Sequence, residues 1–290
     1  MIEQIIIGIA NGSVYASLAL ALVLIYRATG VVNFAQGEMA TLTAYLSYTM
    51  ITAGVPWPLA VILALLAAGM IGAAIYWFLV RRIRGRARDT NIAILTLALF
   101  TFLASVTLSI WTGIPKAFPP IFGEGIVEFG SVRVSVNVIV VLIIAFVTML
   151  LVTGFFRFTK LGLGLQGATT NETAARIVGI EPNRVYLVGW ILAAVVGGIS
   201  GILAANLLLL EPTMMLMPMI LAFAAMAVGG LSSPFGAVLG GLILGLAQSL
   251  LGTYVDGAAA LRTPIAFLLL VLVLLIRPQG FFGRGKVVRP

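Results

Sequence analysis

The sequence predicts an all-α, polytopic membrane protein: a helical bundle of about eight or nine membrane segments with a small external β-hairpin. Three observations indicate this class. The 290 residues are 61% hydrophobic and 9% charged, whereas about a quarter of the residues of a soluble domain are charged. Apolar runs of the roughly 20 residues that cross a hydrocarbon core recur along the chain. Basic residues gather in a few of the connections between these runs. We therefore expect residues 1–290 to form one integral-membrane domain.

Nine apolar runs account for most of the chain, and each is expected to form a helix. The first run is longer than the apolar part of a signal peptide and has no basic residue before it, so we expect it to be retained. The seventh and eighth runs are short and joined by GGLSSPFG, and a pair of re-entrant half-helices is the alternative there. These readings give nine or seven crossings, and a short N-terminus inside gives eight. The runs span residues 5–26, 36–53, 58–80, 91–111, 136–156, 184–209, 214–230, 235–252 and 263–276.

The net charge of +8 comes mainly from basic residues in the connections between the apolar runs. If every run crosses once, three basic clusters and Arg27 fall on one side, which the positive-inside rule makes the cytoplasm. We therefore expect the N-terminus outside and the C-terminus inside a bacterial or archaeal cytoplasmic membrane. The clusters are Arg81, Arg82, Arg84, Arg86 and Arg88; Arg157, Lys160, Arg176 and Arg184; and Arg277, Arg284, Lys286 and Arg289.

The external loop, residues 112–135, begins with prolines that disfavour a helix. The segments VEF and VRV then alternate around a two-residue Gly-Ser turn, which predicts a hairpin. In that register Glu128 faces Arg133, an opposite-charge pair across the strands. The hairpin serves either as a structural cover or as a contact for a delivery protein.

A polar island between Arg157 and Arg184 interrupts the apolar sequence on the predicted cytoplasmic side. Thr169 precedes Glu172 by three residues, which is a capping-box pattern. Gly179 suits the position after a helix, and Pro182 suits the first turn of the next one. We expect a short helix from about residue 170 to 178. A short capped helix between two spans can fit into another protein.

Glycines four residues apart indicate close helix packing, because small residues let backbones approach each other in lipid. They occur in VVGGISGIL and GAVLGG, at Gly197 and Gly201 and at Gly236, Gly240, Gly241 and Gly245.

Polar residues at membrane depth are costly and are therefore candidates for function. Glu38 is an acid that borders a span on the predicted cytoplasmic side of the N-terminal half. It is read as a structural pair with Arg27, as a pathway or gating residue, or as part of a proton relay. The candidate pathway or gating residues are Asn11, Asn33, Gln36, Glu38, Asn206 and Gln248.

The chain has no cysteine and no histidine. This excludes thiol chemistry, disulfides, a histidine base and the usual zinc and haem ligands, so we expect no catalytic, cofactor-binding or metal-binding residue. No second acid is visible at mid-span depth, since Glu211 and Asp256 fall in predicted external connections. A proton-driven carrier is therefore poorly supported. A weakly polar route suits zwitterionic or apolar cargo.

Four segments carry a resemblance to a known family. They are NGSVYASLALALVLIYRATGVVNFAQGEMATLTAY, NETAARIVGIEPNRV, GGLSSPFGAVLGGLILG and RPQGFFGR. They resemble the branched-chain amino acid permeases of ATP-binding-cassette (ABC) importers, specifically the shorter H-type subunit. The resemblance implies that the polar island is the ATPase-coupling loop, with the coupling residues Thr169, Glu172, Ala174, Arg176 and Gly179. Similar permeases often carry Arg near the positions of Leu163 and Gln166, and this sequence does not.

The resemblance also implies partners. The chain would form a heterodimeric pore with a second, homologous permease subunit. Two cytoplasmic ATPases would supply ATP and Mg²⁺ chemistry, and an extracytoplasmic binding protein would deliver leucine, isoleucine, valine or related neutral amino acids. The chain itself lacks a GxxxxGK[ST] phosphate loop, so it is expected to bind no cofactor and to catalyse no reaction. The alternatives are a permease for urea, short amides or sugars, and an ion-coupled secondary carrier.

Overall fold

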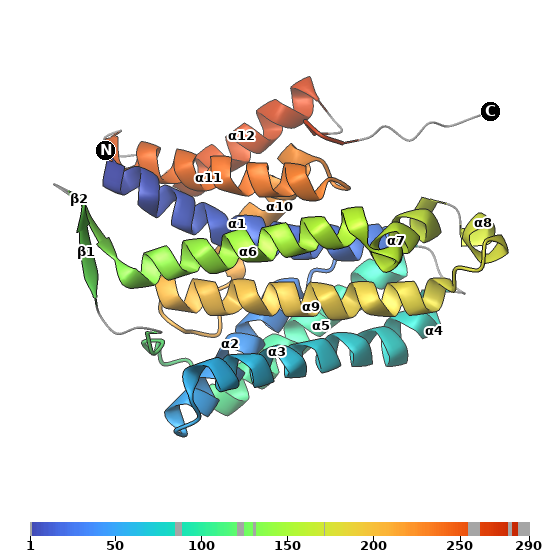
Figure 1. Cartoon of the computed structure of the whole chain (residues 1–290), viewed down its shortest axis with the longest axis horizontal. Helices are drawn as coiled ribbons and strands as arrows, with labels where there is room; N and C mark the ends of the chain where they lie inside the picture. Colours follow the sequence, from blue (N-terminus) through green and yellow to red (C-terminus); the bar gives the residue numbers. More distant parts are fainter. Residues whose placement is uncertain are drawn as a thin grey trace.

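The computed structural model describes residues 2–84, 89–120, 125–129, 132–170, 172–254, 262–277 and 280–283. Within these ranges the chain is a helical bundle with one small antiparallel sheet, which confirms the predicted fold class. Figure 1 shows long helices side by side, with strands β1 (Ile126–Phe129) and β2 (Val132–Ser135) at one end. Helices α7 (Lys160–Thr170) and α8 (Glu172–Ile177) lie at the other. These are called the hairpin end and the α8 end.

Six of the described helices are long and apolar enough to cross a membrane. They are α1 (Ile2–Thr29), α3 (Trp57–Ala74) with its continuation, α5 (Asp89–Trp111), α6 (Val136–Phe158), α9 (Pro182–Leu207) and α11 (Pro234–Tyr254). The continuation of α3 is a π-helical segment, η1 (Ile75–Val80), followed by α4 (Arg81–Arg84). Three shorter helices are α2 (Gln36–Thr52), α10 (Leu216–Gly229) and α12 (Arg262–Ile276).

Each of the nine predicted runs thus contains a helix. In the doubtful pair, α10 has 14 residues and α11 has 21, so α11 is long enough for a full span and α10 is not. The first described residues lie at the hairpin end (Figure 1), whereas residues 281 and 282 pair with the end of α10 near the α8 end. An odd number of crossings places the two ends of a chain in this way.

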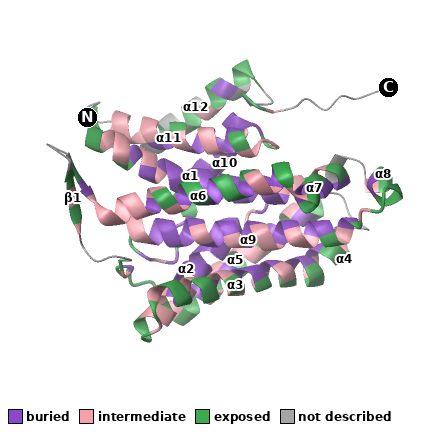
Figure 2. Cartoon of the chain, in the orientation of Figure 1, coloured by how far each residue is buried: buried purple, intermediate pink, exposed green. Residues whose placement is uncertain are grey.

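Helices α1 and α9 form the centre of the bundle, and most of their residues are buried (Figure 2). The outer helices α5 and α6 expose large apolar side chains, among them Phe102, Phe146 and Leu151. A soluble protein would not leave such a surface uncovered. In a membrane it faces lipid or another apolar protein surface.

Glycines bring the central helices into direct backbone contact, as their spacing predicts. A Cβ atom added at Gly245 of α11 would collide with the backbone of Gly12 in α1. One added at Gly241 would collide with Ala16, and one at Gly201 of α9 would collide with Ala40 of α2. The packing role of these glycines follows from the absence of a side chain.

The connection between α1 and α2 lies inside the bundle. The Gln36 amide nitrogen donates to the carbonyl oxygen of Ala193 over 2.9 Å. Because Ala193 falls near the middle of α9 (Pro182–Leu207), α2 begins near mid-bundle depth. Asn33 and Gln36 are fully buried. From the sequence, Asn33 and Gln36 count among the polar residues at membrane depth, in the first connection and at the start of the second predicted span.

The predicted hairpin is present in the predicted register. Glu128 pairs with Arg133 across β1 and β2, and their side chains form an ion pair of 2.9 Å. The Gly-Ser turn between the strands lies outside the described residues. Nearby, a backbone bridge between Lys116 and Leu210 ties the loop to the connection after α9. The loop is therefore fastened to the bundle, as a structural cover requires.

Several charged residues used in the topology prediction also lie outside the described part of the chain, so the structure does not place them. They are Arg86, Arg88, Asp256, Arg284, Lys286 and Arg289.

Candidate functional site

The polar island contains two helices rather than the single predicted one. Residues 160–170 form α7 and residues 172–177 form α8, so Thr169 belongs to α7 and does not cap a helix that starts at residue 170. The side chain of Thr169 lies outside the described parts. The sequence did not predict α7, because its segment KLGLGLQGA is rich in glycine, which lowers helix propensity.

The end of α8 follows the prediction. Gly179 has a φ of +82°, which an L side chain rarely adopts. Its N–H donates to the carbonyl of Arg176 over 3.0 Å, and the Ile180 N–H donates to that of Ala175 over 2.9 Å. Pro182 then starts α9. This turn ends the helix and sends the chain back toward the bundle.

The tip of α8 is apolar and exposed. Ile177 is 81% exposed and Val178 is 73% exposed, while Ala175 is buried. Ala174 is exposed on the same short helix. Glu172 and Arg176 form an i,i+4 ion pair of 2.8 Å. Two large apolar side chains are thus exposed at the α8 end, and they form a candidate contact surface for another protein.

The base of this loop is firmly attached to the long helices. The Tyr186 hydroxyl of α9 donates to the carbonyl of Ala168 in α7 over 3.0 Å, and Tyr186 is buried. The Gln166 amide nitrogen donates to the carbonyl of Phe156 in α6 over 3.1 Å. Leu165 of α7 is buried against Gly189 of α9. These contacts join α7 to both α6 and α9.

Arg27 at the end of α1 does not form the expected pair with Glu38. Its Nε donates to the carbonyl of Ser232 over 2.6 Å, and its guanidinium lies 4.8 Å from the centroid of the Phe156 ring. Arg27 thus connects α1 to α6 and to the turn between α10 and α11. Among the described residues, no ion pair joins it to Glu38.

Asn33 and Gln36 form a small hydrogen-bond network that fixes the start of α2. The Asn33 amide donates to the Gln36 side-chain oxygen over 3.1 Å, and its own oxygen accepts from the Ala35 N–H over 3.0 Å. The Gln36 side chain extends this network to α9 by its hydrogen bond to the carbonyl of Ala193. These amides satisfy one another and the backbone, which is what buried polar groups require.

Glu38, on the first turn of α2, differs from them. It is only 4% exposed, and no hydrogen bond or ion pair of the described residues involves its carboxylate. Burial of an ionised carboxylate costs several kcal/mol. The positive end of the α2 dipole offsets roughly 0.3–1 kcal/mol of that cost, up to about 2 kcal/mol in a favourable geometry. The helix end alone does not compensate for the burial.

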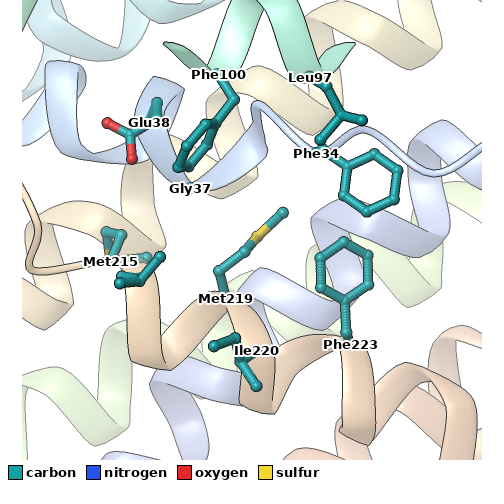
Figure 3. Close-up of a pocket in the computed structure, with 10 residues that line it drawn as sticks. Phe34, Gly37, Glu38, Leu97, Phe100, Met215, Met219, Ile220 and Phe223 are labelled. Carbon is teal, nitrogen blue, oxygen red and sulfur yellow. The ribbon is translucent and has the colours of Figure 1, made fainter. Parts of the chain in front are cut away.

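Glu38 lines a cavity of about 190 Å³ between α2, α5 and α10. Apart from Glu38 and Gly37, its wall consists of aromatic and aliphatic side chains (Figure 3). The Phe34 and Phe223 rings are 5.5 Å apart. In Figure 3 they lie at the opposite end of the cavity from the Glu38 carboxylate. The remaining lining residues are Leu97, Phe100, Met215, Leu216, Met219 and Ile220.

The family described as "Branched-chain amino acid transport system / permease component" matches residues 4–274. The chain belongs to this family. The permease is 30% identical to "High-affinity branched-chain amino acid transport system permease protein LivH" of Salmonella typhimurium, over 99% of this chain and 96% of that one. It is 28% identical to BraD of Pseudomonas aeruginosa, over 99% and 97% of the two chains. A probable LivH of Methanocaldococcus jannaschii is also 28% identical, over 92% and 87%.

A solved structure, "PsaBC from Streptococcus pneumoniae in complex with Fab", has a similar fold. Its TM-score with the permease is 0.51, the sequence identity is 14%, and the match covers 96% of this chain and 91% of that one. At this identity the likeness concerns the fold alone. The permease is thus a multi-pass helical membrane protein of a transport family.

The other predicted pathway residues, Asn11, Asn206 and Gln248, are not among the residues that line the Glu38 cavity. The Gln248 side-chain oxygen of α11 accepts a bond of 3.2 Å from the Tyr15 hydroxyl of α1. Asn206 donates to the carbonyl of Ile202 within its own helix over 2.8 Å. Asn11 is half-buried on α1. Of the six residues, Asn33 and Gln36 are hydrogen-bonded to each other, and Glu38 lines the cavity.

Sequence reasoning missed the cavity wall. Phe34, Phe100, Met219 and Phe223 read as ordinary apolar residues of three separate segments. One signal was available, since Phe34 stands inside the polar string VNFAQGE. A large aromatic residue beside buried amides and an acid is characteristic of a binding pocket.

Proposed function

We propose that this protein is a non-catalytic permease subunit of an ABC importer for branched-chain or related neutral amino acids. The observation that carries the proposal is the exposed apolar tip of α8. The preceding helix, α7, is joined to α6 and α9 by the hydrogen bonds of Gln166 and Ala168. A transport subunit without an ATP site of its own needs a contact through which an ATPase can move it. The tip of α8 is called the handle because we propose that it makes this contact. Family membership and the names of the relatives support the cargo class.

The mechanism that follows is mechanical. Two cytoplasmic ATPase subunits bind ATP and Mg²⁺, and each holds the α8 loop of one permease subunit. Closure of the ATPase pair moves α8, and α7 transmits this movement to the ends of α6 and α9. The pathway between this chain and a second, homologous permease opens in turn to either side. An extracytoplasmic binding protein delivers the cargo at the hairpin end.

The contact is tested by Ile177→Glu in the complete complex, reconstituted into proteoliposomes with the binding protein and leucine. We expect ATP-driven uptake to fall by about tenfold or more, because a charge in an apolar interface core is strongly unfavourable. Ile126→Glu is the matched control, since Ile126 is 65% exposed in β1 at the opposite end. It should leave co-purification of the ATPases unchanged. Normal ATPase binding and normal uptake by the Ile177→Glu variant would contradict the proposal that the handle contacts the ATPase.

The proposed orientation has an independent test, because the natural chain has no cysteine. Single cysteines at Val178 and Glu128 should react with a membrane-impermeant thiol reagent from opposite sides of intact cells. Val178→Cys should be labelled only after the membrane is opened, and Glu128→Cys should be labelled at once. The reverse labelling pattern would show that the orientation in the membrane is opposite to the one proposed. The same complex offered urea, short amides or sugars with matching binding proteins tests the cargo class.

A further inference from the structure

Glu38 is the buried ionisable side chain that the described contacts leave unused. It lines the cavity between α2, α5 and α10, and none of the residues that the structure describes forms an ion pair or hydrogen bond with it. We propose that this cavity is a cargo subsite, in which the Glu38 carboxylate receives the α-ammonium group of a neutral amino acid and the aromatic and methionine wall receives its aliphatic side chain. The inference rests on the proposed function and names the residues that recognise the cargo.

The charge argument comes first. A carboxylate removed from water requires a cation or several hydrogen-bond donors. Arg27, the cation that the sequence suggests, is occupied by Ser232 and Phe156. A primary ammonium group brings one positive charge and three donors, in the same form as the lysine head group. It would thus supply what the interior of this subunit does not.

The shape of the cavity agrees with such a ligand. Its volume is about 190 Å³, and an apolar cavity of about 150 Å³ is known to hold benzene. A branched aliphatic side chain fits this space. The wall opposite Glu38 carries Phe34 and Phe223 (Figure 3). The cavity is therefore charged at one end and apolar at the other, as a neutral amino acid is.

The cavity also has an outlet and a wall that can yield. Leu97 and Leu216 at its margin are about half exposed, so it reaches the surface of the subunit between α5 and α10. Met215, which immediately precedes α10, and Met219 of α10 form the wall that faces α2. Methionine adapts easily because it is unbranched and flexible. Cargo can therefore pass along α10 without a large backbone movement.

The first test is Glu38→Gln in the complete reconstituted importer with radiolabelled leucine. Gln keeps the shape and removes the charge. We expect the maximal uptake rate to fall by about tenfold or more, since loss of one partner of a buried charge pair is costly. Assembly with the partner subunits and ATPase stimulation by the loaded binding protein should remain. Glu38→Asp should restore part of the uptake.

Three outcomes would overturn the subsite. One is uptake by Glu38→Gln within about twofold of the natural protein. Another is failure of Glu38→Gln to assemble, which would make Glu38 a contact within or between subunits. The third is equal uptake by Glu38→Gln and Glu38→Asp. In each case the natural complex still imports leucine. If the natural complex imports no neutral amino acid, it is the proposed function that fails.

The second test changes the size of the cavity. A Cβ atom at Gly37 would lie 3.4 Å from the Cβ of Met219 and 3.6 Å from that of Met215, in ordinary contact. Gly37→Ala therefore narrows the space without forcing the helices apart. With saturating loaded binding protein, the ratio of leucine to valine uptake should fall by about threefold or more, because one methylene group in a tight pocket is strongly discriminated. An unchanged ratio would exclude the cavity as the side-chain site.

Discussion

The backbone N–H of Phe281 donates to the carbonyl oxygen of Val228 over 2.9 Å, which joins the C-terminal segment to the end of α10. Phe282 forms the same kind of bond to Gly229 over 3.1 Å, and its ring lies 5.4 Å from that of Phe235. The described residues 280–283 therefore cover the turn between α10 and α11, and this arrangement is called the C-terminal clasp. Arg27 binds the same turn through Ser232.

This clasp predicts a measurable difference between two glycines. Gly280 has a φ of +74°, and an added Cβ would press on the backbone of Gly230 and Ala227. Gly30 has a φ of +76° with nothing within 4 Å of the added atom. Gly30→Ala should cost about 1–2 kcal/mol through backbone strain alone. Gly280→Ala should cost more, seen as a larger loss of thermal stability in detergent. Equal losses would show that the clasp contributes nothing.

Arg27 should be important for stability although it lies near the surface. Arg27→Ala removes a charge-assisted hydrogen bond and the contact with the Phe156 ring, and we expect a loss of about 1.5–3 kcal/mol. Arg184→Ala is the control, because the Arg184–Glu181 pair is solvent-exposed and such pairs contribute about 0–1 kcal/mol. Thermal unfolding of the purified subunit compares them. A smaller effect at Arg27 than at Arg184 would disprove its structural role.

The contact between α1 and α11 predicts opposite effects for one substitution at two sites. Gly245→Ala places a methyl group into the backbone of Gly12, so we expect a loss of roughly 2 kcal/mol or more. At Gly154→Ala the methyl group meets only the edge of Phe158, at 3.9 Å. Helix propensity should then leave stability unchanged or raise it by up to about 1 kcal/mol. The melting temperatures of the two variants should therefore move apart.

The turn after α8 can be tested by the choice of side chain. Gly179 has open space around it, so backbone conformation decides the outcome. Gly179→Asn should preserve coupling, because Asn tolerates this conformation. Gly179→Val should strain the turn by about 1–3 kcal/mol and lower the ratio of cargo moved to ATP hydrolysed. Coupling that survives Gly179→Val would mean that the turn need not be rigid.

The sequence was a good guide wherever local chemistry decides the structure. Apolar length set the nine helical segments. The two-residue Gly-Ser turn predicted the hairpin register in which Glu128 faces Arg133, and Gly179 marked the end of α8. These features depend on neighbours in the chain, so a single segment contains the necessary information.

The errors arose where distant segments meet. The sequence of α7 contains three glycines among eleven residues, yet contacts with Phe156 and Tyr186 stabilise it as a helix. The sequence indicates that Asn33, Gln36 and Glu38 lie at membrane depth, but it does not show which residues they contact. Those contacts depend on Ala193 and on the glycines of α9. The cavity combines α2, α5 and α10, which no local pattern links.

The glycine seam between α1 and α11 also limits how the molecule can change shape. Two backbones in direct contact have no side chains that could rearrange between them, so a slide of one past the other would break many contacts at once. These two helices are therefore expected to move together as one rigid body. Inward- and outward-facing forms of the importer should then differ in the contact between α10 and α2, where Met215 and Met219 lie.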